Sequence, residues 1–183
     1  VVITATTRLC YDYLIVATGA RHAYFGHKDW EAVAPGLKKI DEATDMRKRL
    51  LLAFERAEAM NDPDEQQRLL TFSVVGGGPT GVELAGAIAE LARHTIVCDF
   101  RNIDPSSARV VLVEAGPRIL PSFPEKLSAS AAAQLSRLGV EIVTGDAVVQ
   151  CDNTGLALKS GKTIDAATII WAAGVMASAA ARW

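Results

Sequence analysis

Three glycines at a fixed spacing, Gly76, Gly78 and Gly81, are the residues of this sequence that best indicate chemistry with a ligand. They lie in the stretch "SVVGGGPTGVELAGAIAEL", after two valines typical of a strand and before a helical pattern. Between a strand and a helix, the pattern Gly-x-Gly-x-x-Gly is a dinucleotide-binding fingerprint. Its first glycine permits a tight turn, its second lets the backbone approach a diphosphate, and its third lets helix and strand pack closely. The spacing therefore predicts a diphosphate site.

The start of the helix that follows the glycines is expected to supply further binding groups. The first N–H groups of a helix have no partner within it, and the partial positive charge of this end attracts phosphate. Pro79 and Thr80 occupy that first turn, where the missing N–H of a proline costs little. Gly77, within the glycine run, completes the predicted nucleotide-binding segment.

An acidic residue at the end of the next predicted strand completes the fingerprint. Glu114, in "VVLVEAG", can accept hydrogen bonds from the ribose hydroxyls of an adenosine. It lies farther from Gly76 than the roughly 20 residues usual for this motif, which an inserted loop at 98–108 explains. A carboxylate at this place would repel the additional phosphate of NADP, so we favour NAD. Ala115 follows directly, and Arg118 either weakens that repulsion or is a surface arginine.

Glu83 is the charged residue nearest the start of the predicted helix, between two apolar neighbours. A negative charge near a helix N-terminus stabilises the helix through its dipole. Alternatively, the side chain faces the cleft and forms a hydrogen bond with the carboxamide or the ribose of a nicotinamide nucleotide. The sequence leaves both interpretations open.

The elements around this turn alternate between strand and helix. The strands are predicted at 72–75, 109–114, 140–144 and 168–172, the helices at 80–95 and 124–138, and three short hairpin strands near 147–151, 155–159 and 162–164. This order predicts an α/β, Rossmann-like fold with a central parallel sheet, helices and a three-stranded antiparallel meander. In such a fold, a ligand lies outside the carboxyl ends of the parallel strands.

The residues before the glycine turn carry a different pattern. Tyr13–Ala17 is an apolar run that predicts a buried strand, and Thr18-Gly19 predicts the turn that ends it. A loop is expected at 20–39, then a helix from 41 to about 60 and a short helix up to residue 70.

The abrupt start and the lack of an initiator methionine lead us to expect a piece of a longer protein. An apolar strand without its sheet would pack on its own domain, pair with the same segment of a second copy, or be poorly ordered.

Length and composition exclude several classes of protein. The 183 residues suit one compact domain, and the net charge of −2 with scattered Lys and Arg argues against nucleic-acid binding. Apolar stretches are too short for a membrane-spanning helix, and the first residues lack a signal-peptide pattern.

The residues that commonly bind metals are isolated from one another. Cys10, Cys98 and Cys151 form no Cys-x-x-Cys pair, fit a reducing compartment, and are each expected to be small buried hydrophobes. The three histidines are expected to be isolated surface or loop residues, namely His22, His27 and His94. We therefore expect no metal site.

Several stretches together resemble the type II NADH:quinone oxidoreductases. These are single-subunit NADH dehydrogenases of the FAD- and NAD(P)-binding pyridine nucleotide-disulfide oxidoreductase superfamily. The similar stretches are "YDYLIVATGA", "YFGHKDWE", "PGLKKIDEATDMRKRLLLAFERAE", "SVVGGGPTGVELAGAIAELA", "DFRNIDPSSARVVLVEAGPRILPSFPE" and "TIIWAAGV". The similarity covers nearly the whole chain. Its more specific parts are "GGGPTGVELAG" and "DFRNIDP…EAGPRIL".

The resemblance implies an FAD domain built from two segments, one on each side of an inserted NADH domain. On that pattern, residues 1–20 are the tail of the first FAD segment and 21–70 a connecting loop and helix. Residues 71–174 are the NADH-binding domain, and 175–183 begin the return to the FAD domain.

The resemblance also assigns roles to individual residues. Glu83 matches a glutamate that family members place near the nicotinamide, and Ala173 and Gly174 match the strand end that lines the NADH cleft. Thr18 and Gly19 match positions near the FAD, as does Gly174.

In the full-length protein, the resemblance implies hydride transfer from NADH to FAD and then electron transfer to a quinone of the respiratory chain. The fragment alone would be inactive without the FAD domain. The full-length protein is expected in the cytoplasm, peripheral on the cytoplasmic face of the membrane through parts absent here. A homodimer is possible.

Two other interpretations remain open. The chain could come from another reductase of the superfamily, of the ferredoxin or disulfide reductase type. It could also be a non-enzymatic nucleotide-sensing module built on the same fold.

Overall fold

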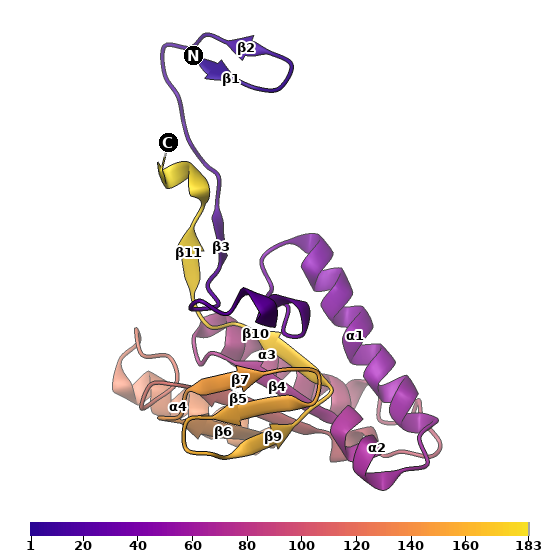
Figure 1. The fold of residues 1–183 in the computed structure, drawn as a ribbon. Helices are drawn as coiled ribbons and strands as arrows, with labels where there is room; N and C mark the ends of the chain where they lie inside the picture. The colour runs from indigo at the N-terminus through magenta and orange to yellow at the C-terminus, as the bar shows by residue number, and fades with distance from the viewer. Residues whose placement is uncertain (183) are drawn as a thin grey trace.

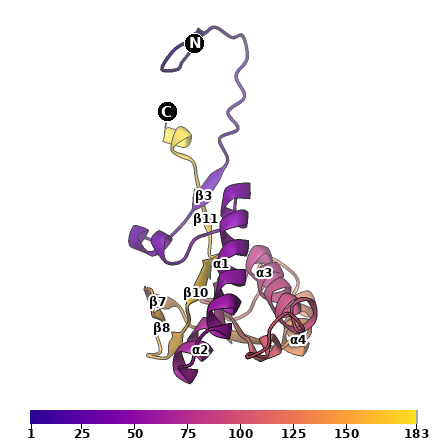
Figure 2. The ribbon, with the colours of Figure 1, turned by 90° about the vertical axis from the view of Figure 1, so that its right-hand side faces the viewer.

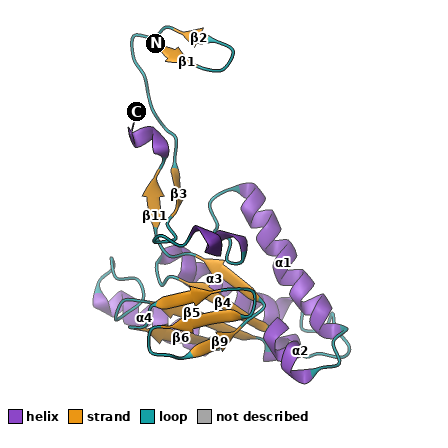
Figure 3. Ribbon diagram, in the orientation of Figure 1, coloured by secondary structure: helices purple, strands orange, loops and turns teal. Residues whose placement is uncertain are grey.

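A four-stranded parallel sheet forms the centre of the computed structural model, which describes residues 1–182 (Figures 1 and 3). Its strand order is β10-β4-β5-β6. The strands are β4 (Thr71–Val75), β5 (Arg109–Glu114), β6 (Val140–Thr144) and β10 (Thr168–Trp171). All pair in parallel, which confirms the predicted α/β fold with a parallel sheet. Every residue of β4 and β10 is buried, as expected for strands covered on both faces.

Alternate residues of each strand face different layers, because successive side chains of a strand point to opposite faces. In β5, Val110 and Leu112 pack in the core on the helical side, whereas Val111 and Val113 pack against the meander. The helices are α1 (Ile40–Glu58), α2 (Pro63–Leu69), α3 (Pro79–Glu90) and α4 (Glu125–Arg137). The antiparallel meander consists of β7 (Val148–Cys151), β8 (Gly155–Leu158) and β9 (Thr163–Asp165). Figure 2 shows α3 and α4 on one side of the sheet and the meander on the other.

The ends of the predicted helices differ in detail from the structure. The helix expected up to residue 95 is α3 followed by one π-helical turn, η2 (Leu91–Thr95). Helix α4 ends before Gly139, whose φ of +77° suits a glycine helix stop, as predicted. The loop at 98–108 contains a short 3-10 turn, η3 (Pro105–Ser107).

Glu58, in the last turn of α1, anchors the inserted loop. Its carboxylate accepts hydrogen bonds from the backbone N–H groups of Arg101, Asn102 and Ile103, at 2.9–3.1 Å. The side chain of Asn102 donates in return to the carbonyl oxygen of Glu58 at 3.2 Å. This contact fixes the insertion that lengthens the segment between the glycine turn and β5.

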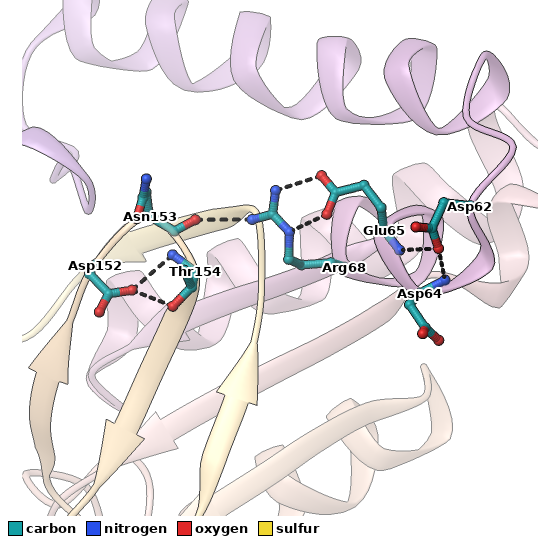
Figure 4. Close-up of polar contacts among 7 residues, drawn as sticks. All are labelled: Asp62, Asp64, Glu65, Arg68, Asp152, Asn153 and Thr154. Atoms are coloured by element: carbon teal, nitrogen blue, oxygen red, sulfur yellow. Dashed lines mark hydrogen bonds and ion pairs between the residues drawn. The ribbon is translucent and has the colours of Figure 1, made fainter.

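Polar contacts join α2 to the first turn of the meander (Figure 4). Asp62 caps α2 by accepting the N–H groups of Asp64 and Glu65. Arg68 forms two hydrogen bonds with Glu65, at 2.6 and 2.7 Å, and donates to the carbonyl oxygen of Asn153 at 3.0 Å. The guanidinium therefore links two segments that are far apart in the sequence.

The first twenty residues extend away from the body of the molecule (Figures 1 and 2). They contain a small hairpin, β1 (Val2–Ile3) with β2 (Arg8–Leu9). The prediction of a buried strand at Tyr13–Ala17 is wrong for this chain, because no described strand pairs with it; Tyr13 is 93% exposed and Ile15 89%. Packing of this segment on its own domain is therefore also wrong, whereas pairing with a second copy stays a prediction.

Two further strands lie where a loop or a chain end was expected. Strand β3 (Ala20–His22) pairs antiparallel with β11 (Val175–Ala177), and these two strands run from the body toward the arm (Figure 1). Short 3-10 segments follow at η1 (Lys28–Ala32) and η4 (Ala179–Arg182). The prediction of a loop at 20–39 is therefore only partly correct, because this range contains β3 and η1.

Two of the cysteines and one histidine depart from expectation. Cys10 and Cys98 are exposed rather than buried, whereas Cys151 is buried at the end of β7 as predicted. Burial raises the pKa of the Cys151 thiol to about 11. His22 is a strand residue whose side chain is only 11% exposed, and its Nε2 lies 3.2 Å from Oε2 of Glu42.

Candidate functional site

A cavity of about 340 Å³ opens at the carboxyl ends of β4, β5 and β10. It is lined by the glycine turn, by the residues that follow β5, β6 and β10, and by aromatic residues of 25–30. The lining residues used below are Phe25, His27, Trp30, Gly76, Gly78, Glu114, Ala115, Asp146, Ala172, Ala173 and Gly174. The location is the one expected for the ligand of an open parallel sheet.

Two of the three fingerprint glycines are required by the protein's own backbone. Gly76 has φ +110°, and a Cβ there would lie 2.6 Å from the backbone nitrogen of Ala173. A Cβ at Gly81 would collide with the carbonyl oxygen of Gly76, so the helix can approach the strand only without a side chain. The tight turn and the close packing predicted for these two positions are both present.

Gly78 differs from the other two glycines. Its φ of −73° and ψ of 180° are open to any residue, and apart from Gly78 and its two chain neighbours none of the described residues has a heavy atom within 4 Å of the position of a Cβ. The folded chain therefore does not explain a glycine here. Because Gly78 also lines the cavity, the free space beside it is available to a ligand.

The N-terminus of α3 meets the same cavity through Gly78. Gly78 is the N-cap residue, so no side chain of the described chain caps the helix, and Pro79 occupies the first turn. Pro79 and Thr80 are both exposed. Uncapped N–H groups at this end suit an anion, because they need an acceptor and carry partial positive charge.

Glu114 both lines the cavity and holds the glycine turn. Its Oε2 accepts the N–H of Gly77 at 2.6 Å, and its Oε1 accepts the N–H of Gly116 at 2.6 Å. A Cβ at Gly77 would lie only 2.9 Å from the Cβ of Glu114, which explains the glycine there. Each carboxylate oxygen can accept more than one hydrogen bond, so both retain capacity for a hydroxyl. The sequence indicated the acid but not this internal role.

A second carboxylate, Asp146, lines the cavity after the end of β6. It accepts the backbone N–H of Ser160 at 3.0 Å and the Ser160 hydroxyl at 2.5 Å. Asp146 belongs to no motif, and its place just after a predicted strand was the available signal for it in the sequence. Two carboxylates on one side make that part of the cavity unfavourable for a further phosphate.

Arg118 and Glu83 lie outside the lining of this cavity. The Arg118 guanidinium donates to the carbonyl oxygens of Leu120 and Pro121, at 3.1 and 2.9 Å, and so closes the loop after β5. Glu83 is exposed on α3. A contact of either residue with a nucleotide stays a prediction.

An aromatic cluster forms the wall at the end of β10. The Nε1 of Trp171 donates to the carbonyl oxygens of Ala23 and Ala173, at 2.9 and 3.0 Å. Its ring stacks on Tyr24 at 5.2 Å between centroids and tilts against Trp30 at 5.4 Å. Burial, the largest cause, raises the pKa of Tyr24 to about 12. No sequence pattern indicated this cluster, because Trp171 is far from Tyr24 and Trp30 in the chain.

The residues expected near an FAD lie mostly on the arm. The hydroxyls of Thr18 and Ser178 form a hydrogen bond across the two chain segments, and Gly19 has φ +68° with open space around it. Thr18 lines a separate apolar hollow with residues 1–3, 11 and 14–17. Of these residues, Gly174 lines the cavity at the carboxyl ends of the parallel strands, and Thr18 and Gly19 do not.

The chain is similar in sequence to curated proteins of known activity. A type II NADH:quinone oxidoreductase of Mycobacterium tuberculosis, Ndh, is 50% identical over 172 residues, which are 92% of this chain and 37% of that protein. A second one from the same organism, NdhA, is 46% identical over 177 residues, 94% of this chain and 38% of the relative. The chain therefore spans well under half the length of these relatives.

Solved structures show the same similarity in three dimensions. The structure of NDH2 from Plasmodium falciparum in complex with NADH matches with a TM-score of 0.85 and 28% identity, covering 93% of this chain and 36% of that one. A ferredoxin reductase from Rhodopseudomonas palustris matches with a TM-score of 0.61 at 20% identity, which shows a shared fold alone.

The sequence profile of the family described as "Pyridine nucleotide-disulphide oxidoreductase" matches residues 2–182, almost the whole chain. This chain therefore belongs to the pyridine nucleotide-disulphide oxidoreductase family.

Proposed function

We propose that this chain binds NADH, with the diphosphate at the turn of Gly76–Gly81 and the N-terminus of α3. The observation that carries the proposal is Gly78, a glycine that the folded chain does not require and that borders a cavity. A diphosphate that approaches the backbone at this point would explain why position 78 is a glycine. The uncapped N–H groups of α3 supply the donors.

The adenosine half of NADH lies toward β5 in this proposal. Glu114 accepts hydrogen bonds from the ribose hydroxyls while it continues to hold Gly77 and Gly116. Glu114 and Asp146 together repel a phosphate on that ribose, which favours NAD over NADP. Ala115 lines this part of the cavity, and Arg118 stabilises the loop beside it.

The nicotinamide half lies toward the end of β10. Ala173 and Gly174 line the cavity there. Glu83, exposed on α3, is the residue that we expect to contact the nicotinamide. The structure of NDH2 from Plasmodium falciparum was solved in complex with NADH, which supports this choice of nucleotide.

In the longer protein, NADH supplies hydride, and FAD accepts it and passes electrons to a quinone. The two Mycobacterium tuberculosis relatives are type II NADH:quinone oxidoreductases, which supports this activity. Residues 71–174 bind NADH. Residues 1–20 and 175–183 belong to the FAD side, with Thr18 and Gly19 near the flavin. Residues 21–70 connect the two parts.

No helix of the described residues has the length and apolar character needed to cross a membrane. The rest of the full-length protein would contact the membrane, on the cytoplasmic face of that membrane.

Calorimetric titration of the 183-residue chain with NADH and NADPH tests the binding proposal. We expect binding of NADH and a markedly weaker binding of NADPH. Glu114→Ala should reduce that preference, and Glu125→Ala, in the exposed first turn of α4, should leave it unchanged. Equal affinity of the unmodified chain for both nucleotides would refute the NAD assignment, and failure to bind either would refute the site.

The activity of the longer protein needs a separate test. Purified full-length protein should contain FAD and should reduce a soluble quinone at the expense of NADH. Reduction of a ferredoxin or a disulfide in its place would identify another reductase of the family. Binding of NADH without any flavin would indicate a nucleotide-sensing module.

A further inference from the structure

Phe25 has a backbone conformation that is unfavourable for its residue type. Among residues 1–182, the non-glycine residues with positive φ are Phe25, at +50°, and Leu120, at +49°. A bulky residue in this region is strained and persists only where the surrounding structure fixes it, often at ligand sites. Phe25 fits that description, because it lines the nucleotide cavity while 72% of it is exposed.

Contacts from the end of β10 fix the position of this ring. Gly174 has φ +78°, and a Cβ there would lie 3.0 Å from Cζ of Phe25. The N–H of Ala23 donates to the carbonyl oxygen of Gly174 at 3.4 Å, and the ring of Phe25 tilts against Trp171 at 6.5 Å between centroids. One edge of the Phe25 ring is therefore packed, and the rest stands free at the rim of the cavity.

The sheet order decides which half of a dinucleotide would reach Phe25. The order is β10-β4-β5-β6, and the glycine turn follows β4 in the middle. Glu114, at the end of β5, lies on one side of the turn, whereas Gly174 and Phe25 lie on the other, beside β10. A dinucleotide held by its diphosphate at the turn and by its adenosine ribose at Glu114 therefore extends its second half toward Phe25.

We propose that Phe25 is a nicotinamide-binding residue, whose exposed ring packs against the nicotinamide ring of NADH. This inference rests on the proposed NADH site. The aromatic ring offers an apolar surface to a flat ligand ring, and the strained backbone holds that surface at the rim before the ligand arrives. Phe25 is thus a determinant of affinity for the nicotinamide end alone.

The test compares two ligands in calorimetric titrations of the full 183-residue chain: NADH, and ADP-ribose, which lacks the nicotinamide ring. Phe25→Gly removes the ring and suits a positive φ. We expect it to weaken NADH binding about two- to tenfold, the effect of one aromatic contact. ADP-ribose affinity should stay the same, which also shows that the cavity of the variant is intact.

Two variants serve as controls. Phe25→Tyr keeps the ring and should restore NADH affinity. Tyr13→Gly removes another exposed aromatic residue, 93% exposed on the arm, and should change neither affinity. An equal loss for NADH and ADP-ribose in Phe25→Gly, or no loss for either, would overturn the role of Phe25. If the unmodified chain bound neither ligand, the nucleotide site itself would be refuted.

Discussion

Gly78→Ala should separate the binding of the nucleotide from the stability of the chain. The backbone of Gly78, with φ −73° and ψ 180°, accepts alanine without strain, and outside residues 77–79 no heavy atom of the described chain lies within 4 Å of the new methyl group. Replacing glycine by alanine at such a site restricts the unfolded chain and stabilises the fold by about 0.4–1 kcal/mol. For a chain of this length, that raises the melting temperature by about 1–4 °C.

The same methyl group would stand between the backbone and the diphosphate. If it prevents one hydrogen bond between a backbone N–H and a charged phosphate, the loss is about 1.5–3 kcal/mol. That corresponds to a roughly 10- to 150-fold weaker affinity for NADH. The variant should therefore be more stable than the parent and bind NADH much more weakly.

Thermal unfolding and calorimetric titration measure the two effects on the same sample. Gly86→Ala is the matched control, because Gly86 lies on the same helix and its Cβ would make an ordinary 3.5 Å contact with Leu135. This control should gain stability through helix propensity and keep its NADH affinity. A Gly78→Ala variant that binds NADH as tightly as the parent would refute the reasoning about the bare turn.

Further predictions concern stability and reactivity. Gly76→Ala should lower the free energy of unfolding by at least about 1–3 kcal/mol in urea titrations, because φ is +110° and the methyl would meet the Ala173 backbone. At Glu58, partial desolvation raises the pKa, but hydrogen bonds from Asn102 and its neighbours outweigh it and lower the pKa overall. This contribution to stability is present above the unfolded pKa of about 4.3 and is lost as the pH falls through the lower folded value. Parent and Glu58→Gln stabilities should therefore converge in acid; a constant difference down to pH 2 would contradict this. In iodoacetamide labelling of the native chain at pH 8, the two exposed cysteines should react quickly and Cys151, with its raised pKa, slowly; three equal rates would contradict its burial.

The body of the fold was predictable because its signals are local. Apolar runs such as "RVVLVE" and the glycine stop at Gly139 indicate strands and helix ends without knowledge of their neighbours. The segment Tyr13–Ala17 carries the same local signal but is exposed here. A run of apolar residues becomes a strand only where another strand pairs with it, and the sequence does not show the partner.

The site was predictable where a motif defines it and not where separate segments meet. The fingerprint identified the glycine turn and Glu114. It did not indicate that the Glu114 carboxylate holds Gly77 and Gly116, because hydrogen bonds of one acid to two backbone segments leave no spacing pattern. The contact of Phe25 with Gly174 was hidden for the same reason, since the two residues are distant in the chain.

The pairing of β3 with β11 brings the two ends of the sheet-containing body of the fold side by side. Thr18 and Ser178 are joined by their hydroxyls just beyond that pair. A unit whose ends adjoin can be inserted into a surface loop of another protein without pulling that loop apart. Residues 20–177 thus have the geometry of a unit that could be inserted into a host protein, and fusion to a fluorescent host would give the proposed NADH binding an optical readout.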